Sequence, residues 1–510
     1  MVVVVGRGDL TFADVVAVAR QGVRVELAPE ARERMARSRG HVDAAAASDA
    51  LVYGITTGVG ALASAHIPPE ARVALQYALL RSHGAGMGPP APPEVVRAMM
   101  LARASALAKG YSGVRPGVAQ ALLDLLNAGV TPYVPLYGSL GASGDLAPLA
   151  HVALCLVGEG WALGADGERV AAAAALREAG LAPLALEAKE GLALLNGTDG
   201  MLAMLVLACV DGAMLFRTAD VVCAMSVEAL LGTDRPYAPE LQAIRPHPGQ
   251  EKSAANLAGA LAGSAIVASH RYSTHAVQDA YAMRCHPQVL GAARDTLEFA
   301  AQVATRELSA AVDNPVVLPD GRVESTGNFH GEPLAFACDF LAIAAAEAGA
   351  IAERRIDRLL DDTRSRGLPP FLSPAPGVNS GLMVAQYTAA ALVAENRRLA
   401  YPASVDSLPT SGMQEDHVSM GWGAAVKLCQ VLENLARIIA IEAVCAARAL
   451  DLRAPLEPAP ATRAVRDLLR SRIPGLGPDR FLAPELLAAE ELVRSGALLK
   501  AAEEVIGPLR

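Results

Sequence analysis

The stretch Gly138-Ser-Leu-Gly-Ala-Ser-Gly-Asp-Leu-Ala-Pro-Leu-Ala-His151 passes from a glycine- and serine-rich loop into an apolar helical run at Asp145. Within it, the tripeptide Ala142-Ser143-Gly144 has an unusual chemical option. The Gly144 amide nitrogen has no Cβ beside it, so in a strained loop it can attack the Ala142 carbonyl carbon and close a five-membered ring. Loss of water from Ser143 would leave a methylidene group conjugated to that ring. The loop therefore predicts either an electrophile built from backbone or an ordinary turn before a helix.

The chain around this loop has the composition of a mainly α-helical protein. Of its 510 residues, 52% are hydrophobic, 4% aromatic and 19% charged, which favours packed helices over a β-rich or disordered chain. Long runs with few helix breakers cover residues 198–231, 287–311, 330–361, 381–399 and 413–450. Several exceed the usual helix length of roughly 11–12 residues. They predict a central bundle of long helices, with an N-terminal domain that carries the reactive loop.

Capping residues delimit the shorter elements. Thr11 is a typical N-cap for a helix over 12–21, and Gly22 fits its C-terminal cap. Pro116 and Gly129 bracket another helix in the same way. Short strands are expected at Val2–Val5 and in a hairpin over 316–325 that turns at Pro-Asp-Gly. The predicted domains are an N-terminal domain (1–197), a central long-helix bundle (198–454) and a C-terminal helical segment (455–510).

The charge balance and the spacing of the cysteines indicate which partners and which cell compartment to expect. The net charge is −9 with both signs interspersed, so we expect no nucleic-acid partner. The seven cysteines are scattered without CxxC spacing, which is typical of reduced thiols. The N-terminus lacks the features of a signal peptide. The most apolar run, 200–210, is shorter than the ~20 residues that span a bilayer. We therefore expect a cytoplasmic protein with no membrane partner.

Two glycine-rich segments hold the first candidate site residues. Tyr53 lies in Val-Tyr-Gly-Ile-Thr-Thr-Gly-Val-Gly, where it is either a packing tyrosine or a general base whose pKa has fallen well below ~10. His83 lies in Arg-Ser-His-Gly-Ala-Gly-Met-Gly. It is either a capped or core histidine or a hydrogen-bonding group in a pocket wall that glycines keep free of bulk.

Further candidates lie in polar loops later in the chain. Asn196, in Leu-Leu-Asn-Gly-Thr, is either a turn residue or an amide of the site. Gln278, Tyr281 and Arg284 are spaced i, i+3, i+6, so a helix would present all three on one side. Arg284 offers a planar fork for a carboxylate, and an exposed helix face is the alternative.

The last two candidates are an aromatic ring and a carboxylate. Phe329 follows Gly327-Asn328 and can pack against a reactive ring or a substrate ring. Glu415, in Gln-Glu-Asp-His-Val-Ser-Met, either binds an imidazole or stabilises a helix N-terminus. Metal and nucleotide sites are not indicated, because the chain has no His-Glu-x-x-His, no paired cysteines and no phosphate-binding Gly-Lys-Ser/Thr loop.

Taken in order from about residue 10 to about residue 450, these blocks resemble the aromatic amino acid ammonia-lyases. Within that family the pair Ser82-His83 resembles the histidine-specific branch. The resemblance implies that the reactive tripeptide matures into 4-methylidene-imidazol-5-one, with no external cofactor and no metal. It implies catalytic roles for Tyr53, Ala142, Ser143, Gly144, Asn196 and Tyr281, and substrate-binding roles for His83, Gln278, Arg284, Phe329 and Glu415.

The resemblance also implies a reaction and an assembly. The substrate would be L-histidine, converted to trans-urocanate and ammonia, and the enzyme would be a homotetramer whose active sites combine loops from three subunits. Gly84 and Gly331 stand where the family often has alanine, which we expect to loosen the pocket slightly. Two alternatives remain. One is a tyrosine or phenylalanine ammonia-lyase or aminomutase on the same scaffold, and the other is a non-catalytic helical assembly protein.

Overall fold

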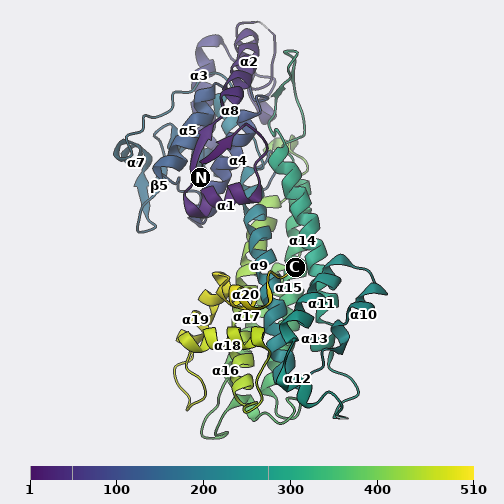
Figure 1. Ribbon diagram of the computed structural model, residues 1–510. Helices are drawn as coiled ribbons and strands as arrows, with labels where there is room; N and C mark the ends of the chain where they lie inside the picture. The colour runs from purple at the N-terminus through teal and green to yellow at the C-terminus, as the bar shows by residue number, and fades with distance from the viewer. Residues whose placement is uncertain (1, 49, 274) are drawn as a thin grey trace. The chain divides into compact units, whose positions relative to one another are not determined.

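The computed structural model describes residues 2–48, 50–273 and 275–510 and divides the chain into two compact units. Unit 1 comprises Met1–Leu207, Ala300–Asp339 and Pro402–Val426, and unit 2 comprises Ala208–Phe299, Phe340–Tyr401 and Lys427–Arg510. Both units are mainly helical, as the composition predicted (Figure 1). The division of the chain into three consecutive domains stays a prediction.

Unit 1 combines short helices with four two-stranded sheets. β1 (Val2–Val5) pairs in parallel with β2 (Arg24–Leu27). The antiparallel pairs are β3 (Met87–Pro90) with β4 (Pro135–Tyr137), β5 (Trp161–Leu163) with β6 (Arg169–Ala171), and β7 (Val316–Val317) with β8 (Val323–Glu324). Its helices are α1 (Phe12–Gln21), α2 (Pro29–Ala46), α3 (Arg72–His83), α4 (Pro93–Ala108), α5 (Pro116–Ala128), α6 (Leu146–Leu156), α7 (Ala172–Glu178) and α8 (Glu190–Leu195).

Among its described residues, unit 2 contains helices joined by loops and no named strand. It contains α10 (Pro239–Ala243), α11 (Pro248–Leu261), α12 (Ala265–Ser269), α13 (Tyr281–Arg284), α16 (Met383–Leu399), α18 (Pro460–Arg472), α19 (Ala483–Arg494) and α20 (Ala497–Ile506). Four long helices have residues in both units: α9 (Asp199–Ala229), α14 (His286–Ser309), α15 (Glu332–Leu360) and α17 (Gly421–Asp451). Short 3₁₀ turns are η1 (Gly60–Leu62), η2 (Pro69–Ala71), η3 (Arg235–Tyr237), η4 (Pro370–Leu372) and η5 (Ser411–Met413).

The predicted capping residues and strands are confirmed. The Thr11 side chain accepts a hydrogen bond from the Asp14 amide, and Gly22 ends α1 with φ 65°. The strand at Val2–Val5 and the hairpin around Pro-Asp-Gly both form. The expectation that these were the only strands is wrong, since β2 to β6 are also present. Those strands have three or four residues, too few to show an alternating pattern, and only their pairing partners define them.

The long helices form close to the predicted segments, with one exception. The last was expected from residue 413, but α17 begins at Gly421. The residues before it fold back on themselves, because Thr410 N donates to the Glu415 carbonyl oxygen at 2.8 Å. The helix N-terminal role considered for Glu415 is therefore wrong, since its carboxylate precedes the first turn of α17 by several residues.

Buried ion pairs join the long helices inside unit 2. Asp220 on α9 accepts hydrogen bonds from His286 and Arg294 on α14, at 3.0 and 2.5 Å. Arg355 on α15 donates to Glu442 on α17 at 2.5 and 2.8 Å, and both side chains are fully buried. Removing one partner from such a pair would leave an uncompensated charge, so these contacts select one register of the bundle.

Two helices are apolar and long enough to cross a membrane by length and composition, α9 and α15. In both, most of the apolar stretch is buried inside the protein, 78% of it in α9 and 67% in α15. The apolar run at 200–210 therefore continues further than the sequence suggested. Burial of this kind is typical of the core helices of soluble proteins.

Candidate active site

The loop that contains Ala142-Ser143-Gly144 lies in unit 1, pressed against the turn Asn196-Gly197-Thr198. Gly144 and Gly197 pair as a parallel bridge, and Asp145 N donates to the Gly197 carbonyl oxygen at 2.7 Å. Gly144 has φ +75°, and a Cβ atom there would lie 2.1 Å from the Gly197 oxygen. Only glycine fits at this position, because both the backbone conformation and the close approach exclude a side chain.

Asp145 ties the loop to the start of α9. Its Oδ2 accepts hydrogen bonds from Gly200 N at 2.8 Å and Met201 N at 2.9 Å, and its Oδ1 accepts one from Ser139 Oγ at 3.1 Å. Complete burial raises the pKa of Asp145 to about 7, although these hydrogen bonds oppose the shift. The sequence marked this residue only as the start of a helix, so its role as an anchor was missed.

The segment before α17 holds the other side of the loop. Met420 N donates to the Leu140 carbonyl oxygen at 2.8 Å, and Ser419 Oγ donates to the Gly141 carbonyl oxygen at 3.2 Å. A Cβ atom at Gly141, where φ is +71°, would lie 2.2 Å from Ser419 Oγ. The loop at residues 140–145 is therefore fixed on both sides by segments distant in sequence.

Asn196 is buried beside this loop with one polar atom left over. Its Nδ2 donates to the Asn314 carbonyl oxygen at 2.7 Å, and its own carbonyl oxygen accepts from Arg103 Nη1 at 3.0 Å. Its Oδ1 has no hydrogen-bond partner although the residue is only 3% exposed. A buried unpaired acceptor costs free energy unless a ligand satisfies it, which favours a site role over a simple turn.

Tyr53 and Glu415 belong to neighbouring loops of unit 1. Tyr53 Oη accepts a hydrogen bond from Gly60 N at 2.9 Å, and η1, which begins at Gly60, packs against η5 beside Glu415. Burial raises the pKa of Tyr53, the negative charge of Glu415 raises it further, and the Gly60 amide opposes the rise. Burial therefore disfavours the phenolate, and the role of Tyr53 as a general base stays a prediction.

His83 is the last residue of α3 and is partly exposed. Its Nδ1 lies 2.9 Å from the Leu79 carbonyl oxygen and 3.0 Å from Ser82 Oγ. Because a carbonyl oxygen only accepts, Nδ1 is the donor in this contact, and Nε2 is the ring nitrogen left for a ligand. The following glycines reach the reactive loop: a Cβ atom at Gly138 would lie 3.1 Å from Gly86 Cα. His83 thus presents Nε2 from a segment that borders the loop.

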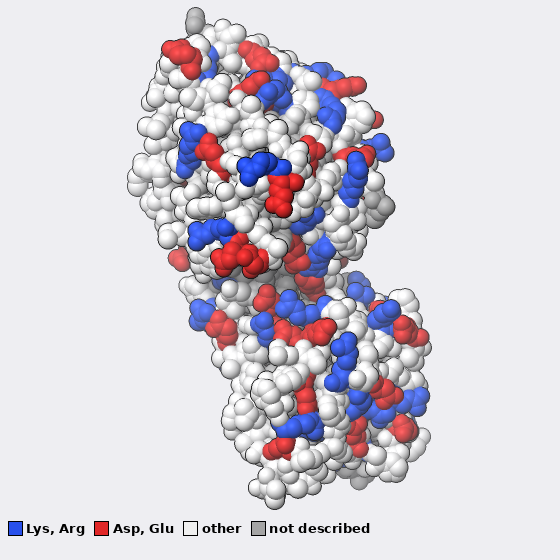
Figure 2. All heavy atoms as spheres, turned by 90° about the vertical axis from the view of Figure 1, so that its left-hand side faces the viewer, with Lys and Arg blue, Asp and Glu red and all other residues white. Residues whose placement is uncertain are grey.

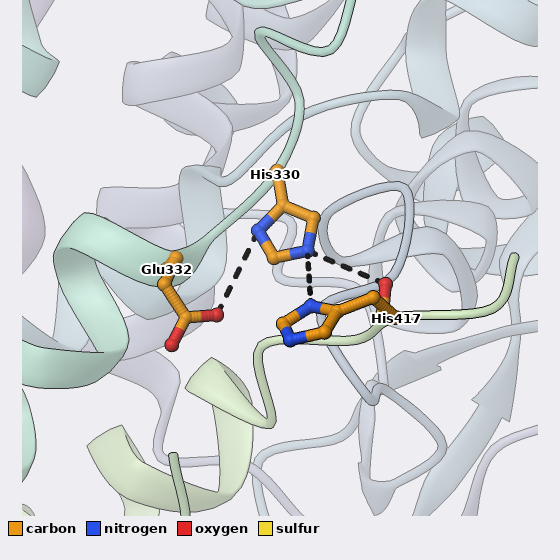
Figure 3. Close-up of side chains that lie close together, drawn as sticks. All are labelled: His330, Glu332 and His417. Carbon is orange, nitrogen blue, oxygen red and sulfur yellow. Dashed lines mark hydrogen bonds and ion pairs between the residues drawn. The ribbon is translucent and has the colours of Figure 1, made fainter. Parts of the chain in front are cut away.

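Phe329 is half-buried and precedes a polar chain that the sequence did not indicate. Figure 3 shows His330 between Glu332 and His417, with its two ring nitrogens facing different partners. His330 Nδ1 lies 3.8 Å from Glu332 Oε2, and His330 Nε2 lies 3.4 Å from His417 Nδ1. These three side chains could hold a metal ion, whereas the sequence predicted no metal site. His417 lies 85 residues after Glu332, so no motif of fixed spacing indicates this group of side chains.

The remaining predicted residues lie in unit 2. The helix expected to carry Gln278, Tyr281 and Arg284 covers only Tyr281–Arg284, so the prediction of one three-residue helix face is wrong. Tyr281 is 71% exposed, and the Arg284 guanidinium stacks over its ring at 4.5 Å. Arg284 Nε donates to the Asp279 carbonyl oxygen at 2.9 Å, which leaves the two terminal nitrogens for a ligand. Gln278 and Arg284 line a cavity of about 460 Å³.

Gly84 and Gly331 do not loosen unit 1. A Cβ atom at Gly84 would lie 2.5 Å from Leu154 Cδ1, and one at Gly331 would lie 2.6 Å from Met201 Sδ. In this chain the leucine and methionine side chains occupy the space that an alanine methyl would take. The expected loosening is therefore wrong, because the neighbours have filled the gap.

The comparisons with known proteins agree along the whole chain. Residues 10–471 match the family model described as aromatic amino acid lyase. A histidine ammonia-lyase of Streptomyces avermitilis is 60% identical over 508 residues, 99% of both chains. The crystal structure of histidine ammonia-lyase from Trypanosoma cruzi has a TM-score of 0.91 at 42% identity, covering 99% of this chain and 95% of that one. Tyrosine aminomutase from Streptomyces globisporus has a TM-score of 0.94 at 38% identity, covering 100% of both.

Proposed function

Because the chain belongs to the aromatic amino acid lyase family, we propose that it releases ammonia from L-histidine to form trans-urocanate. The observation that carries this proposal is the 60% identity, over 99% of both chains, to a histidine ammonia-lyase. His83 and Glu415 support the choice of substrate. An imidazole nitrogen and a carboxylate together suit the two ring nitrogens of a substrate imidazole.

We also propose that Ala142-Ser143-Gly144 forms the 4-methylidene-imidazol-5-one group from the chain itself. Its surroundings fit such a group: Gly144 is forced against Gly197, Asp145 anchors the loop, and the Asn196 Oδ1 acceptor is buried without a partner. When formed, the group would supply an electrophile that makes the substrate amine a better leaving group. No external cofactor is needed for this chemistry.

The other side chains then have distinct tasks. Tyr53 would accept the β-proton, with the Gly60 amide already placed to stabilise its phenolate. A positive charge brought by the substrate would lower the pKa that burial has raised. Arg284 would hold the substrate carboxylate through its free terminal nitrogens, Gln278 would line the same pocket, and Tyr281 would complete the catalytic set. Phe329 would pack against the substrate ring, and the Asn196 amide would lie near the substrate carboxylate.

A homotetramer with shared active sites is the assembly we propose. The exposed Tyr281 supports it, since a catalytic residue is not expected to be left in open solvent. A second observation is an apolar cavity of about 820 Å³ between α14 and α15, where Phe299, Phe340 and Ile343 are 44–45% exposed. An apolar face of this kind is rarely left uncovered on a monomer. Light scattering should give four times the mass of one chain.

The decisive assay incubates the purified protein with L-histidine and follows the ultraviolet absorbance of urocanate. Intact mass spectrometry of the same sample should show a deficit of two waters. Ser143→Ala should abolish turnover and the deficit, whereas Ser471→Ala, at an exposed position of α18, should change neither. A full-mass protein with full activity would reject the proposed electrophile.

The choice of substrate within the family is tested at the same time. L-tyrosine is the second candidate substrate, because the structure is similar to that of a tyrosine aminomutase. A preference for L-tyrosine over L-histidine in the same assay would overturn the proposed substrate without affecting the electrophile. We further propose a cytoplasmic location, which the scattered cysteines and the buried apolar helices support. Cell fractionation would test it.

A further inference from the structure

A cavity in unit 1 lies between α2, the loop after α4 and the turn after β7. Its volume is about 180 Å³. We call it the basic pocket, because its lining includes Arg34, Arg37, His41 and Lys109; the other lining residues are Ser38, Gly110, Tyr111, Val317, Leu318 and Pro319. The α2 residues recur at i, i+3, i+4 and i+7, which places them on one face of the helix.

The positive charge of this pocket is not balanced by its own lining, which contains no carboxylate. Arg34 donates only to the carbonyl oxygens of Gly6 and Ala108, at 2.7 and 3.3 Å. Within the part of the chain that the structure describes, Arg37 and His41 make no hydrogen bond or ion pair. Lys109 is the exception, pairing with Asp9 at 2.8 Å. In a chain of net charge −9, such a cluster is unexpected.

A buried hydroxyl gives an independent indication of a ligand. Ser38 is 6% exposed, and its Oγ has no hydrogen-bond partner. A helical serine usually satisfies its hydroxyl on the carbonyl of the preceding turn, so an unpaired one is uncommon. A buried polar group without a partner costs free energy that a ligand would recover.

The pocket is held by close packing. Gly110 has φ +81°, and a Cβ atom there would lie 3.0 Å from Arg34 Cβ and 3.1 Å from the Arg34 backbone, so glycine lets the loop approach α2. Val317 N donates to the Tyr111 carbonyl oxygen at 2.7 Å, which joins the β7 hairpin to the same loop. The backbone that carries the basic residues is thus held together by contacts of the chain itself.

We propose that the basic pocket binds a small phosphate-class oxyanion, either inorganic phosphate or the phosphate group of a monoester. Guanidinium groups match phosphate oxygens with paired hydrogen bonds, and the Ser38 hydroxyl adds a further donor. A volume of about 180 Å³ admits a phosphate group but not a whole nucleotide. This site is independent of the proposed lyase reaction, because none of its residues belongs to the candidate active site.

The test measures binding of inorganic phosphate and of methyl phosphate to the full chain by titration calorimetry, in sodium chloride of matched ionic strength. We expect saturable binding that Arg37→Ala weakens by about 10-fold or more, since it removes a charge-assisted contact. Ser38→Ala should also weaken binding. The control Arg177→Ala removes an equally exposed cation from α7 and should have no effect.

The result separates this proposal from the proposed function. All three variants should keep wild-type turnover of L-histidine in phosphate-free buffer. Tighter binding of methyl phosphate than of inorganic phosphate would support a monoester as the ligand. Equal binding to wild type and Arg37→Ala would overturn the proposal, as would a phosphate signal that sodium chloride reproduces at the same ionic strength.

Discussion

The two units hold their candidate site residues in opposite environments. In unit 1, Asn196 and Asp145 are buried, and the reactive loop is fixed between the Gly197 turn and the segment before α17. In unit 2, Tyr281 is 71% exposed and its neighbour Val277 is fully exposed. Asn196 and Asp145 are positioned by contacts of their own chain, whereas Tyr281 and Val277 present their side chains to solvent.

This difference indicates which steps a single chain can prepare. In our proposal, the electrophile forms with the help of the buried contacts of unit 1, which the chain supplies itself. In the same proposal, Arg284 binds the substrate carboxylate beside the exposed Tyr281, which another copy of the chain would cover. On the face that Figure 2 shows, acidic and basic side chains are intermixed, so surface charge there does not favour a partner of one charge sign.

The largest expected effect tests the unit 1 side of the comparison. Tyr53→Phe should lower kcat by about 10²–10⁴-fold, the usual cost of losing a general base. The two-water mass deficit should remain, because the ring forms from residues 142–144. Tyr77→Phe is the matched control, since its phenol oxygen also accepts a backbone amide, that of Leu186 at 3.1 Å. Loss of the deficit in Tyr53→Phe would instead make this tyrosine part of the machinery that builds the electrophile.

Glu415→Gln should have the next largest effect. It keeps the size of the side chain but removes the charge, so it should cost about 1.5–3 kcal/mol against L-histidine. The measurement is kcat/KM, with Asp416→Asn as the control because that neighbouring carboxylate is exposed. Unchanged kinetics would return Glu415 to a structural role in the Thr410–Glu415 turn.

Arg284→Lys probes the exposed side of the comparison and should reduce kcat/KM about tenfold or more, at roughly 1.4 kcal/mol per decade. Arg271→Lys, which changes an exposed arginine paired with Asp234, serves as its control.

Mixing subunits of Tyr53→Phe and Arg284→Ala tests directly whether active sites are shared between subunits. If sites are shared between subunits, hybrids of the two weak variants should recover activity, and a mixture no better than its components would contradict sharing.

The last expected effect concerns stability rather than turnover. An unfolded aspartate loses its proton near pH ~3.9, whereas burial raises the pKa of Asp145 in the folded chain to about 7. Between these values the folded state binds more protons, so the contribution of Asp145 to stability falls as pH rises. Asp145→Asn should flatten the decline of the melting temperature between about pH 4 and 7. The exposed Asp166→Asn should leave the slope unchanged.

Patterns that act locally were predicted well from the sequence. The Thr11 cap and the Pro-Asp-Gly hairpin depend on neighbouring residues, and both form as expected. The start of α17 was misplaced because a turn from Thr410 to Glu415 interrupts an otherwise helical pattern. The helix expected for Gln278 to Arg284 covers only Tyr281–Arg284. Regular spacing of three side chains is compatible with a helix, but it does not show that the backbone between them is helical.

The sequence by itself determined the helical class, the long apolar helices and the family, because composition, periodicity and ordered motifs are properties of the chain. Tertiary structure alone decided the close contact of Gly144 with Gly197, the raised pKa values of Asp145 and Tyr53, and the unpaired acceptor on Asn196. These depend on burial and on partners far away in the sequence. Desolvation and hydrogen-bond satisfaction are set by what surrounds an atom in space, which no spacing along the chain records.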